Sequence, residues 1–371
     1  MSLENLALAK TDDFPIEHEG DVHDGKVRGV YWLTPRNSAR LGERFGANAP
    51  ADAPLGIMII SDRISAFEVI WHGQDGLQGV PGKGAALNAI SEYWFGQLDR
   101  LNLAGNHLVH APHPLVWVVQ RAKPVMVEAV ARQYITGSMW RDYNEKGARL
   151  FCGIPLPDGL KKDQRLDTLL LTPTTKGTLR GISGVPEQDD VNLTREQILQ
   201  NFEAFGFDSP EDVDFYEALL SCGFRVISDG LKDVGQIFVD TKLEFGYAPD
   251  RKGQRRMIII DEIGTPDSSR MWSAADYAQG RVVENSKEDF RQFLLGVHGG
   301  KPEDILLNKK RMPERIELAA GYEVPNEVMM RVSAIYKKMA ETITGYKLRE
   351  MEDPRGEVME ALSELGVLET A

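Results

Sequence analysis

Two neighbouring apolar runs, residues 237–246 and 257–260, predict a β-hairpin joined by a polar turn. Side chains of an extended chain point alternately to opposite faces, so every second residue of the first run shares one face. One of these faces is apolar, and the other carries three charged residues, Asp240, Lys242 and Glu244. The returning strand would end beside them at Asp261.

The charged face of this hairpin has the composition of a cation site. Three carboxylates and one lysine on a small surface suit a hard divalent cation with phosphate bound to it. The chain then continues into Thr265–Arg270, a turn rich in anion-binding groups, and phosphoryl transfer needs both kinds of site together. A solvated charged face on an ordinary two-stranded ribbon has the same pattern, so alternation alone leaves both interpretations open.

Hydrophobic periodicity predicts further elements along the chain. Residues 55–60 form an unbroken apolar run typical of a buried strand, and polar residues follow it directly. Apolar residues at helical spacing predict a long helix from Pro325 to Gly345. Residues 34–53, rich in Ala, Asn, Gly and Pro, predict a loop, and residues 177–193 predict an irregular segment.

Four short turns combine glycine or hydroxyl residues with a basic residue, a composition that lets backbone N–H groups approach a phosphate. They are Gly25–Gly29, Pro81–Gly84, Arg132–Ser138 and Thr172–Gly177. The second turn opens an amphipathic helix, and the third feeds a helix whose free N–H groups would assist an anion. Such turns also have ordinary structural interpretations, as a surface hairpin or as a loop before a core helix.

Composition narrows the class of protein. The chain has 371 residues, of which 42% are hydrophobic, and no apolar run approaches the roughly 20 residues of a membrane span. The net charge of −13 argues against a nucleic acid or an anionic membrane as partner, so any anionic substrate must be held by locally concentrated cations. Two cysteines without metal-type spacing, and no signal-peptide pattern, favour the cytoplasm. The sequence leaves the oligomeric state open, and a homo-oligomer is compatible with it.

Seven motifs are spread over nearly the whole chain, from about Gly25 to Gly345. They are Gly25-Lys-Val-Arg28, Ser61-Asp-Arg-Ile-Ser-Ala-Phe67, Pro81-Gly-Lys-Gly84, Arg132-Gln-Tyr-Ile-Thr-Gly-Ser138, Thr172-Pro-Thr-Thr-Lys176, Val239-Asp-Thr-Lys-Leu-Glu-Phe-Gly246 and Asp261-Glu-Ile-Gly-Thr-Pro-Asp-Ser-Ser-Arg270. Taken in this order, they resemble the motifs of the phosphoribosylaminoimidazole-succinocarboxamide synthase (SAICAR synthetase) family.

The resemblance implies an α+β fold of two lobes with ATP bound in a cleft between them, similar to protein kinases and ATP-grasp enzymes. We expect a sheet-rich N-terminal lobe in residues 1–125, a larger lobe in residues 126–345, and a C-terminal extension in residues 346–371. The implied reaction is that of purine biosynthesis, in which ATP, L-aspartate and carboxyaminoimidazole ribonucleotide (CAIR) give SAICAR, ADP and phosphate. Its implied route phosphorylates the imidazole carboxylate, and the aspartate amine then attacks the acyl phosphate.

The same resemblance implies residues for ATP and Mg²⁺. ATP contacts are expected at Gly25, Lys26, Val27, Arg28, Glu128, Asp240, Lys242 and Asp261. Of these, the glycine turn would hold the phosphates and Glu128 would lie at the adenine. The expected Mg²⁺ ligands are Glu244, Asp261 and Asp240, and the expected catalytic cations are Lys242, Lys26 and Arg63.

Substrate contacts are implied at Asp62, Arg63, Ser65, Lys83, Arg132, Ser138, Ser269 and Arg270. A planar guanidinium suits the nucleotide 5′-phosphate, which we assign to Arg132 and Arg270 together with Ser138. Arg63, Ser65 and Lys83 would lie near the imidazole carboxylate or the aspartate. Glu68 departs from the family pattern, which usually has Asp after Ser-Ala-Phe, so the geometry there would differ by one methylene.

Two alternatives to this ligase remain. One is a related ATP-dependent ligase or kinase that acts on another acid, which Glu68 and the altered loop at residues 178–190 would accommodate. The other is a nucleotide-binding regulatory protein without turnover. The presence together of Lys26, Lys242, Glu244 and Asp261 argues against it, because a binder need not keep a complete phosphoryl-transfer set.

Overall fold

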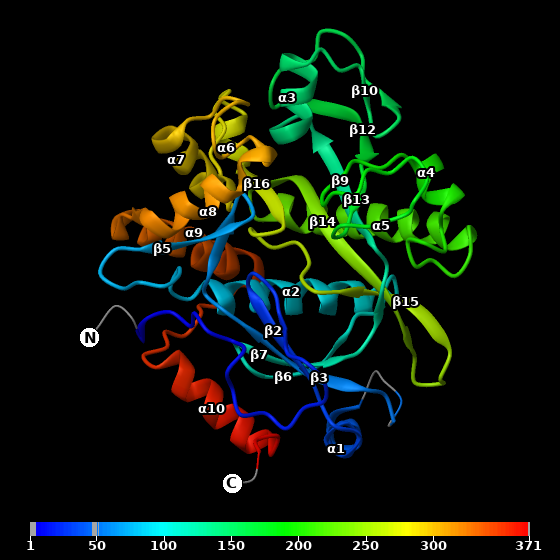
Figure 1. Cartoon of the computed structure of the whole chain (residues 1–371), viewed down its shortest axis with the longest axis vertical. Helices are drawn as coiled ribbons and strands as arrows, with labels where there is room; N and C mark the ends of the chain where they lie inside the picture. The colour runs from blue at the N-terminus through cyan, green and yellow to red at the C-terminus, as the bar shows by residue number, and fades with distance from the viewer. Residues whose placement is uncertain (1–4, 47–49, 51, 370–371) are drawn as a thin grey trace.

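The long strand β14 (Gln236–Pro249) is the centre of the larger of two antiparallel sheets in the computed structural model, which describes residues 5–46, 50 and 52–369. It pairs with β9 (Val127–Tyr134) on one side and with β15 (Arg255–Ile260) and β16 (Ser269–Ser273) in succession along its other edge (Figure 1). The remaining strands of this sheet are β8 (Lys123–Pro124), β12 (Arg165–Leu171) and β13 (Thr174–Thr175). The expected hairpin is therefore confirmed.

The smaller main sheet has five antiparallel strands in the order β1-β2-β3-β7-β6. They are β1 (His23–Asp24), β2 (Arg28–Trp32), β3 (Leu55–Ile60), β7 (Val116–Gln120) and β6 (Leu108–His113). All residues of β3 and β7 are buried, as the continuous apolar runs predict for strands covered on both faces.

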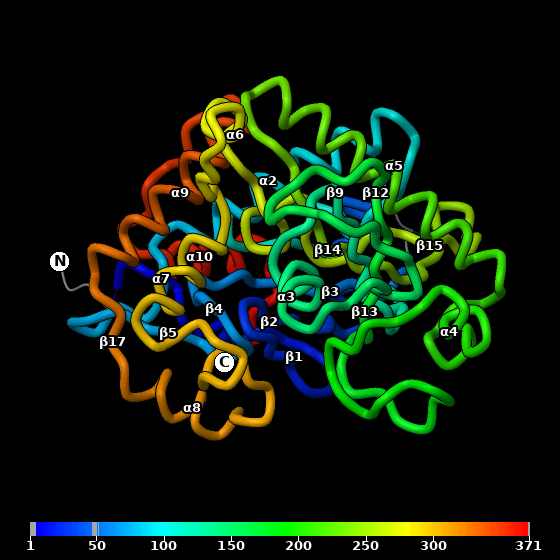
Figure 2. The backbone as a smooth tube through the Cα atoms, turned by 90° about the horizontal axis from the view of Figure 1, so that it is seen from above, coloured from blue at the N-terminus to red at the C-terminus, as the bar shows by residue number. Residues whose placement is uncertain are grey.

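Helix α2 (Lys83–Arg100) lies at the centre of the molecule, where it contacts β3 of the smaller sheet, α5 (Glu211–Asp233) and α9 (Asn326–Thr344) (Figures 1 and 2). It begins at Gly82, whose φ of +78° favours a residue without a Cβ, and buries Leu87, Ile90 and Trp94 on its inner face. Helix α9 ends at Gly345 with φ +81°, so the predicted glycine stop is confirmed. Helix α5 covers β14 and β9 of the larger sheet.

A third sheet lies beside α8 (Met312–Gly321) and consists of β4 (Ile64–Ala66), β5 (Val69–Gly73) and β17 (Glu323–Val324). The other elements are α3 (Gly137–Glu145), α4 (Arg195–Gln200), α6 (Ala274–Tyr277), α7 (Glu288–His298), η2 (Lys309–Arg311), α10 (Pro354–Leu365) and the β10 (Leu150–Phe151) and β11 (Ile154–Pro155) pair. Within the described ranges, no helix has both the length and the apolarity needed to cross a membrane.

The loop expected at residues 34–53 is wrong for its first half, which forms helix α1 (Pro35–Phe45). The Thr34 hydroxyl accepts a hydrogen bond from the Asn37 backbone N–H, and proline occupies the first helical position, where its missing N–H costs nothing. Leu41 is fully buried and anchors the helix. The Thr34 cap, together with tertiary burial of one helix face that composition does not reveal, accounts for the difference. Helix α8 was likewise not predicted.

Candidate functional site

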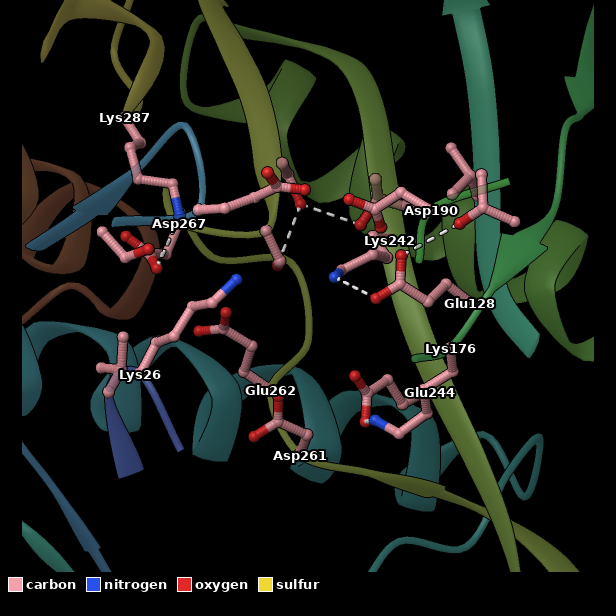
Figure 3. Close-up of a pocket in the computed structure, with 18 of the residues that line it drawn as sticks. Lys26, Glu128, Lys176, Asp190, Lys242, Glu244, Asp261, Glu262, Asp267 and Lys287 are labelled. Carbon is pink, nitrogen blue, oxygen red and sulfur yellow. Dashed lines mark hydrogen bonds and ion pairs between the residues drawn. The ribbon is translucent and has the colours of Figure 1, made fainter. Parts of the chain in front are cut away.

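The charged face of β14 forms one wall of a cavity of about 1170 Å³, to which both main sheets contribute side chains (Figure 3). Asp240, Lys242 and Glu244 all line it, as their alternation along the strand predicts. Single drug-sized ligands fill roughly 300–1,000 Å³, so this cavity has room for more than one reactant.

The turn between β1 and β2 forms a second wall and brings Gly25, Lys26, Val27 and Arg28 to the cavity. The backbone N–H of Gly25 donates to the carbonyl of Arg28 at 2.8 Å, which closes the turn. Lys26 forms no ion pair with any residue that the structure describes, so its charge is available to a bound anion. Arg28 instead forms an ion pair with Asp261 at 3.1 Å and donates a hydrogen bond to Glu262 at 3.0 Å. Burial would lower the pKa of Arg28, but these carboxylates outweigh it and raise the pKa above the ordinary value.

Lys242, whose side chain is partly exposed to the cavity, forms an ion pair with the largely buried Glu128, with 2.6 Å between Nζ and Oε1 (Figure 3). The second carboxylate oxygen of Glu128 accepts from the Thr174 hydroxyl at 3.0 Å. Burial raises the pKa of Glu128, and the nearby Asp190 adds to this, while Lys242 opposes both. Burial alone would lower the pKa of Lys242, but Glu128 and Glu244 outweigh it, so the lysine is held protonated. The Glu128 side chain is therefore directed at Lys242, and its expected place at the adenine stays a prediction.

Glu244 and Asp261 lie on neighbouring strands and line the same cavity. Glu244 pairs with Ile260 across the hairpin, and Asp261 follows Ile260 with φ +64°, a left-handed conformation that departs from the strand. Lys176 contacts Glu244, and Arg28 contacts Asp261. Two carboxylates that each hold a single protein cation fit Mg²⁺, which takes one or two protein carboxylates and completes its shell with water and substrate phosphates.

Asp240 does not join this pair, so the arrangement of three carboxylates expected from the hairpin is not formed. In the part of the chain that the structure describes, no three His, Cys, Asp or Glu side chains converge as a metal site. Asp240 instead accepts from Arg132 at 3.1 Å, from the Arg270 guanidinium, and from the Arg270 backbone N–H at 3.2 Å. Strand pairing causes this, because β14 places Asp240 opposite Arg132 on β9 and Arg270 on β16.

These two arginines form an anion cradle with the first turn of α3. The Arg270 guanidinium packs so closely on Gly137 that a Cβ there would come within 2.6 Å of it, and Gly137 has φ +57°. Ser138 follows as the second residue of the helix and lines the cavity. Ser269 also lines it and shares a 2.8 Å hydrogen bond with the Thr241 hydroxyl. Free helix N–H groups beside two guanidiniums make a cradle suited to phosphate.

Four of the predicted substrate residues come from residues 62–83, and of these only Ser65 lines the cavity. The other three, Asp62, Arg63 and Lys83, lie behind the cavity wall. Asp62 is fully buried and accepts from the backbone N–H groups of Leu8 and Gly84, and burial raises its pKa to about 6. Lys83 is fully buried too, and Asp267 holds its ammonium at 3.5 Å.

Arg63 was expected to contact substrate, but its guanidinium is used within the protein. It donates to the Ser61 hydroxyl at 3.1 Å, to Asp24 at 3.0 Å and to the Gly25 carbonyl at 2.9 Å. Arg63 therefore supports the glycine turn from behind.

The structure also brings residues to the cavity that the sequence did not single out. Lys287 donates to Asp267 at 2.9 Å, and Asp267 accepts from the Tyr336 hydroxyl at 2.7 Å. Burial lowers the pKa of Lys287 to about 8, although Asp267 opposes this. Lys287 lies in a polar stretch without pattern, so no sequence signal marks it. Lys176, by contrast, belongs to one of the four basic turns, so its place at the cavity had a sequence signal, although its contact with Glu244 did not.

Comparison with known proteins gives one consistent family. A family model described as SAICAR synthetase matches residues 50–305. A phosphoribosylaminoimidazole-succinocarboxamide synthase of Vibrio vulnificus is 57% identical over 370 residues, which is 100% of both chains. One of Shewanella amazonensis is 57% identical over 364 residues, 98% of both chains.

Solved structures agree on the fold, which mixes helices and sheets. A SAICAR-synthase from Saccharomyces cerevisiae, complexed with SAICAR, superposes with a TM-score of 0.63 at 28% identity and covers 92% of this chain and 99% of its own. A SAICAR synthetase in complex with ADP has a TM-score of 0.55 at 19% identity, covering 89% of this chain and 100% of its own. A family model over more than half of the chain, together with relatives of this identity over its full length, shows that the chain belongs to the SAICAR synthetase family.

Proposed function

We propose that this protein joins L-aspartate to the carboxylate of CAIR, giving SAICAR, ADP and phosphate in purine biosynthesis. The observation that carries the proposal is the presence in one cavity of an arginine-lined phosphate cradle, a pair of carboxylates, and the paired Lys242. The curated relatives that match the whole chain are synthases of this name, and one solved relative is complexed with SAICAR.

ATP would bind in a cleft between two lobes, residues 1–125 and 126–345, as in protein kinases and ATP-grasp enzymes. Support comes from the cavity wall, to which the smaller sheet contributes the glycine turn and the larger sheet contributes β14. Lys26, which has no carboxylate partner among the described residues, would neutralise the ATP phosphates, and the turn's backbone N–H groups would assist it.

Mg²⁺ would be held by Glu244 and Asp261 and would neutralise charge on the phosphates. Binding would require Lys176 and Arg28 to yield part of their contacts with these carboxylates. We do not include Asp240 in this set, because its carboxylate is taken up by two guanidiniums.

The route proceeds through an acyl phosphate because a carboxylate alone would have to expel oxide. A carboxylate oxygen of CAIR attacks the γ-phosphorus of ATP, and the bond from that phosphorus to the bridging oxygen of ADP breaks. The aspartate amine then attacks the acyl carbon, phosphate leaves with the bonding electron pair, and the amine nitrogen loses a proton. Lys242, protonated and fixed by Glu128, would stabilise the charge that develops on the transferring group.

CAIR would be oriented by its 5′-phosphate in the cradle of Arg132, Arg270, Ser138 and Ser269. A dianionic phosphate placed between the two guanidiniums would share them with Asp240, and a planar fork makes two parallel hydrogen bonds to such a group. Ser65 would contact the substrates on the opposite wall. Asp62, Arg63 and Lys83 would act indirectly, by fixing the segments that form the wall.

The test is ADP release with Mg-ATP, L-aspartate and CAIR, with each substrate omitted in turn. Release that requires all three, together with formation of SAICAR, supports the ligase. Release without aspartate would indicate a kinase-like enzyme, and full activity with a different acid would indicate a related ligase. Nucleotide binding without ADP release in the complete mixture would contradict the proposal and favour a regulatory protein.

A further inference from the structure

A single buried arginine, Arg315 of α8, joins two segments that form one end of the cavity. Arg315 is only 2% exposed. It lies beyond residues 50–305, the part of the chain that matches the family model. The first segment is the turn between β4 and β5, and the second is the stretch 302–309, which precedes α8.

Four hydrogen bonds hold the guanidinium between these segments. On one side it donates to the Phe67 carbonyl and to a carboxylate oxygen of Glu68, both at 2.9 Å. On the other side it donates to the carbonyl of Ile305 at 3.3 Å and to the carbonyl of Asn308 at 3.1 Å. Because a guanidinium is planar and carries five N–H donors, it can satisfy acceptors from both directions at once, which a lysine cannot do.

The turn that Arg315 holds has an unfavourable backbone. Phe67 and Glu68 are the two residues between paired Ala66 and Val69, and both have positive φ, +55° and +70°. Hairpin turns of this shape favour Asn and Gly, and left-handed bulky residues cost on the order of 1–3 kcal/mol each. Such a conformation persists only where surrounding structure enforces it, and the bonds to Phe67 and Glu68 supply that enforcement.

The stretch 302–309 makes a further contact at its C-terminal end. Lys309 donates to the Asp189 carbonyl at 3.3 Å, within the irregular segment at residues 177–193. Pro302, Leu306, Leu307 and Lys309 line the cavity along the way. The C-terminal half of the stretch is therefore held at residues 305 and 308 by Arg315 and at residue 309 by the contact of Lys309 with Asp189.

We propose that Arg315 is a positioning residue that locks the 67–68 turn and the 302–309 stretch into one wall enclosing the amino-acid end of the site. This inference rests on the proposed function and extends it to the part of the cavity that would hold the dicarboxylate substrate. Glu68 is then a partner of Arg315 and not a contact of the substrate.

Charge and chemistry favour the amino acid as the reactant behind this wall. Helix α7 packs against β5 through stacking of His298 on Trp71, and brings Lys287 and Arg291 to the same cavity. Figures 1 and 2 both show α7, β5 and α8 together at one side of the molecule. Lys287 pairs with Asp267 at 2.9 Å and Arg291 with Glu288 at 3.5 Å, and a dicarboxylate would compete with these carboxylates for the two cations. The glycine turn and the arginine cradle are already assigned to the other two reactants. A closed wall would also keep water from the acyl phosphate.

The experiment compares Arg315→Met, Arg315→Lys and Glu68→Gln with the intact protein. Arg355→Met serves as a matched control. Arg355 lies on α10, forms an exposed ion pair with Asp13 at 2.9 Å, and does not line the cavity. KM is measured separately for ATP, CAIR and L-aspartate, and ADP release is compared with SAICAR formation. Thermal unfolding of each variant reports stability.

We expect Arg315→Met to raise the KM for L-aspartate by roughly ten- to a hundredfold, since misplacement by about 1 Å can cost a hundredfold. The KM values for ATP and CAIR should stay within about threefold, and ADP release should exceed SAICAR formation because water competes for the acyl phosphate. Glu68→Gln keeps the hydrogen bonds from Arg315 to the backbone carbonyls, so it should show the same pattern of KM values in weaker form. Arg315→Lys should restore only part of the affinity for L-aspartate that Arg315→Met loses.

Equal changes in all three KM values, a change confined to CAIR or ATP, or tight coupling of ADP to SAICAR in every variant would overturn the inference. If Arg315→Met does not fold, Glu68→Gln and Arg315→Lys decide the question by the same pattern. The two proposals fail in distinguishable ways. An intact protein that makes no SAICAR contradicts the proposed function, whereas normal turnover with Arg315 variants equal to Arg355→Met contradicts only the role of Arg315.

Discussion

Replacing Asp240 by asparagine tests the central electrostatic feature of the site. Asp240 is 5% exposed, and its carboxylate lies between the guanidiniums of Arg132 and Arg270. Asp240→Asn keeps the shape of the side chain and removes its charge. Arg132 then has no carboxylate partner among the described residues, whereas Arg270 keeps Glu288 at 3.1 Å.

The expected loss of stability follows from this geometry. Two unit charges separated by 3.1 Å, the distance from Arg132 to Asp240, attract by about 5 kcal/mol at an effective dielectric constant near 20. Desolvation offsets part of this attraction, and removal of one partner from a buried pair costs about 3–5 kcal/mol. We therefore expect the free energy of unfolding to fall by about 3 kcal/mol or more. Glu288→Gln should cost less, because Asp240 still neutralises Arg270.

The assay is chemical denaturation with and without CAIR or inorganic phosphate. In Asp240→Asn a phosphate would supply the negative charge that the two arginines lack, so ligand should stabilise the variant more than it stabilises the original protein. The KM for CAIR should change in the same direction, towards tighter binding, while kcat falls if the cradle is distorted. A loss below about 1 kcal/mol, or equal stabilisation of both proteins by phosphate, would refute the reasoning.

Three further predictions concern single residues. Lys242→Ala should lower kcat by roughly a hundredfold or more in steady-state assays, the scale of losing one electrostatic stabiliser, and near-normal turnover would contradict its role. Arg270→Lys should raise the KM for CAIR more than that for ATP, because a point charge replaces a planar fork, and an effect confined to ATP would place Arg270 elsewhere. Burial raises the pKa of Asp62 from 3.8 to about 6, so the native state binds a proton more tightly than the unfolded chain does. Its contribution to stability should therefore decline by as much as about 3 kcal/mol as pH rises from about 4 to about 6. The stability difference between the original protein and Asp62→Asn, measured by urea unfolding across this range, should decline with pH, and a flat or rising difference would show the prediction to be wrong.

Local rules of the chain were sufficient to place much of the site. The alternation of a strand put Asp240, Lys242 and Glu244 on one face, and all three line the cavity because period 2 is a property of the extended backbone itself. Glycine signals were equally reliable where the backbone needs a positive φ, as at Gly82 and Gly345. Seven motifs in the family's order identified the family, because each is a short run of neighbouring residues that can be recognised in the sequence without knowledge of the fold.

Partners separated by long stretches of chain were decided only by the tertiary structure. The sequence supplied carboxylates and cations, but strand pairing gave Asp240 to Arg132 and Arg270, 108 and 30 residues away, and so removed it from the proposed metal ligands. Arg63 donates to the protein's own oxygens, and Lys83 is buried 3.5 Å from Asp267, so packing keeps both off the cavity wall. Lys287 and Arg315 came to the cavity from stretches without any pattern. An ion pair forms wherever packing brings two charges together, and no local periodicity encodes which two those will be.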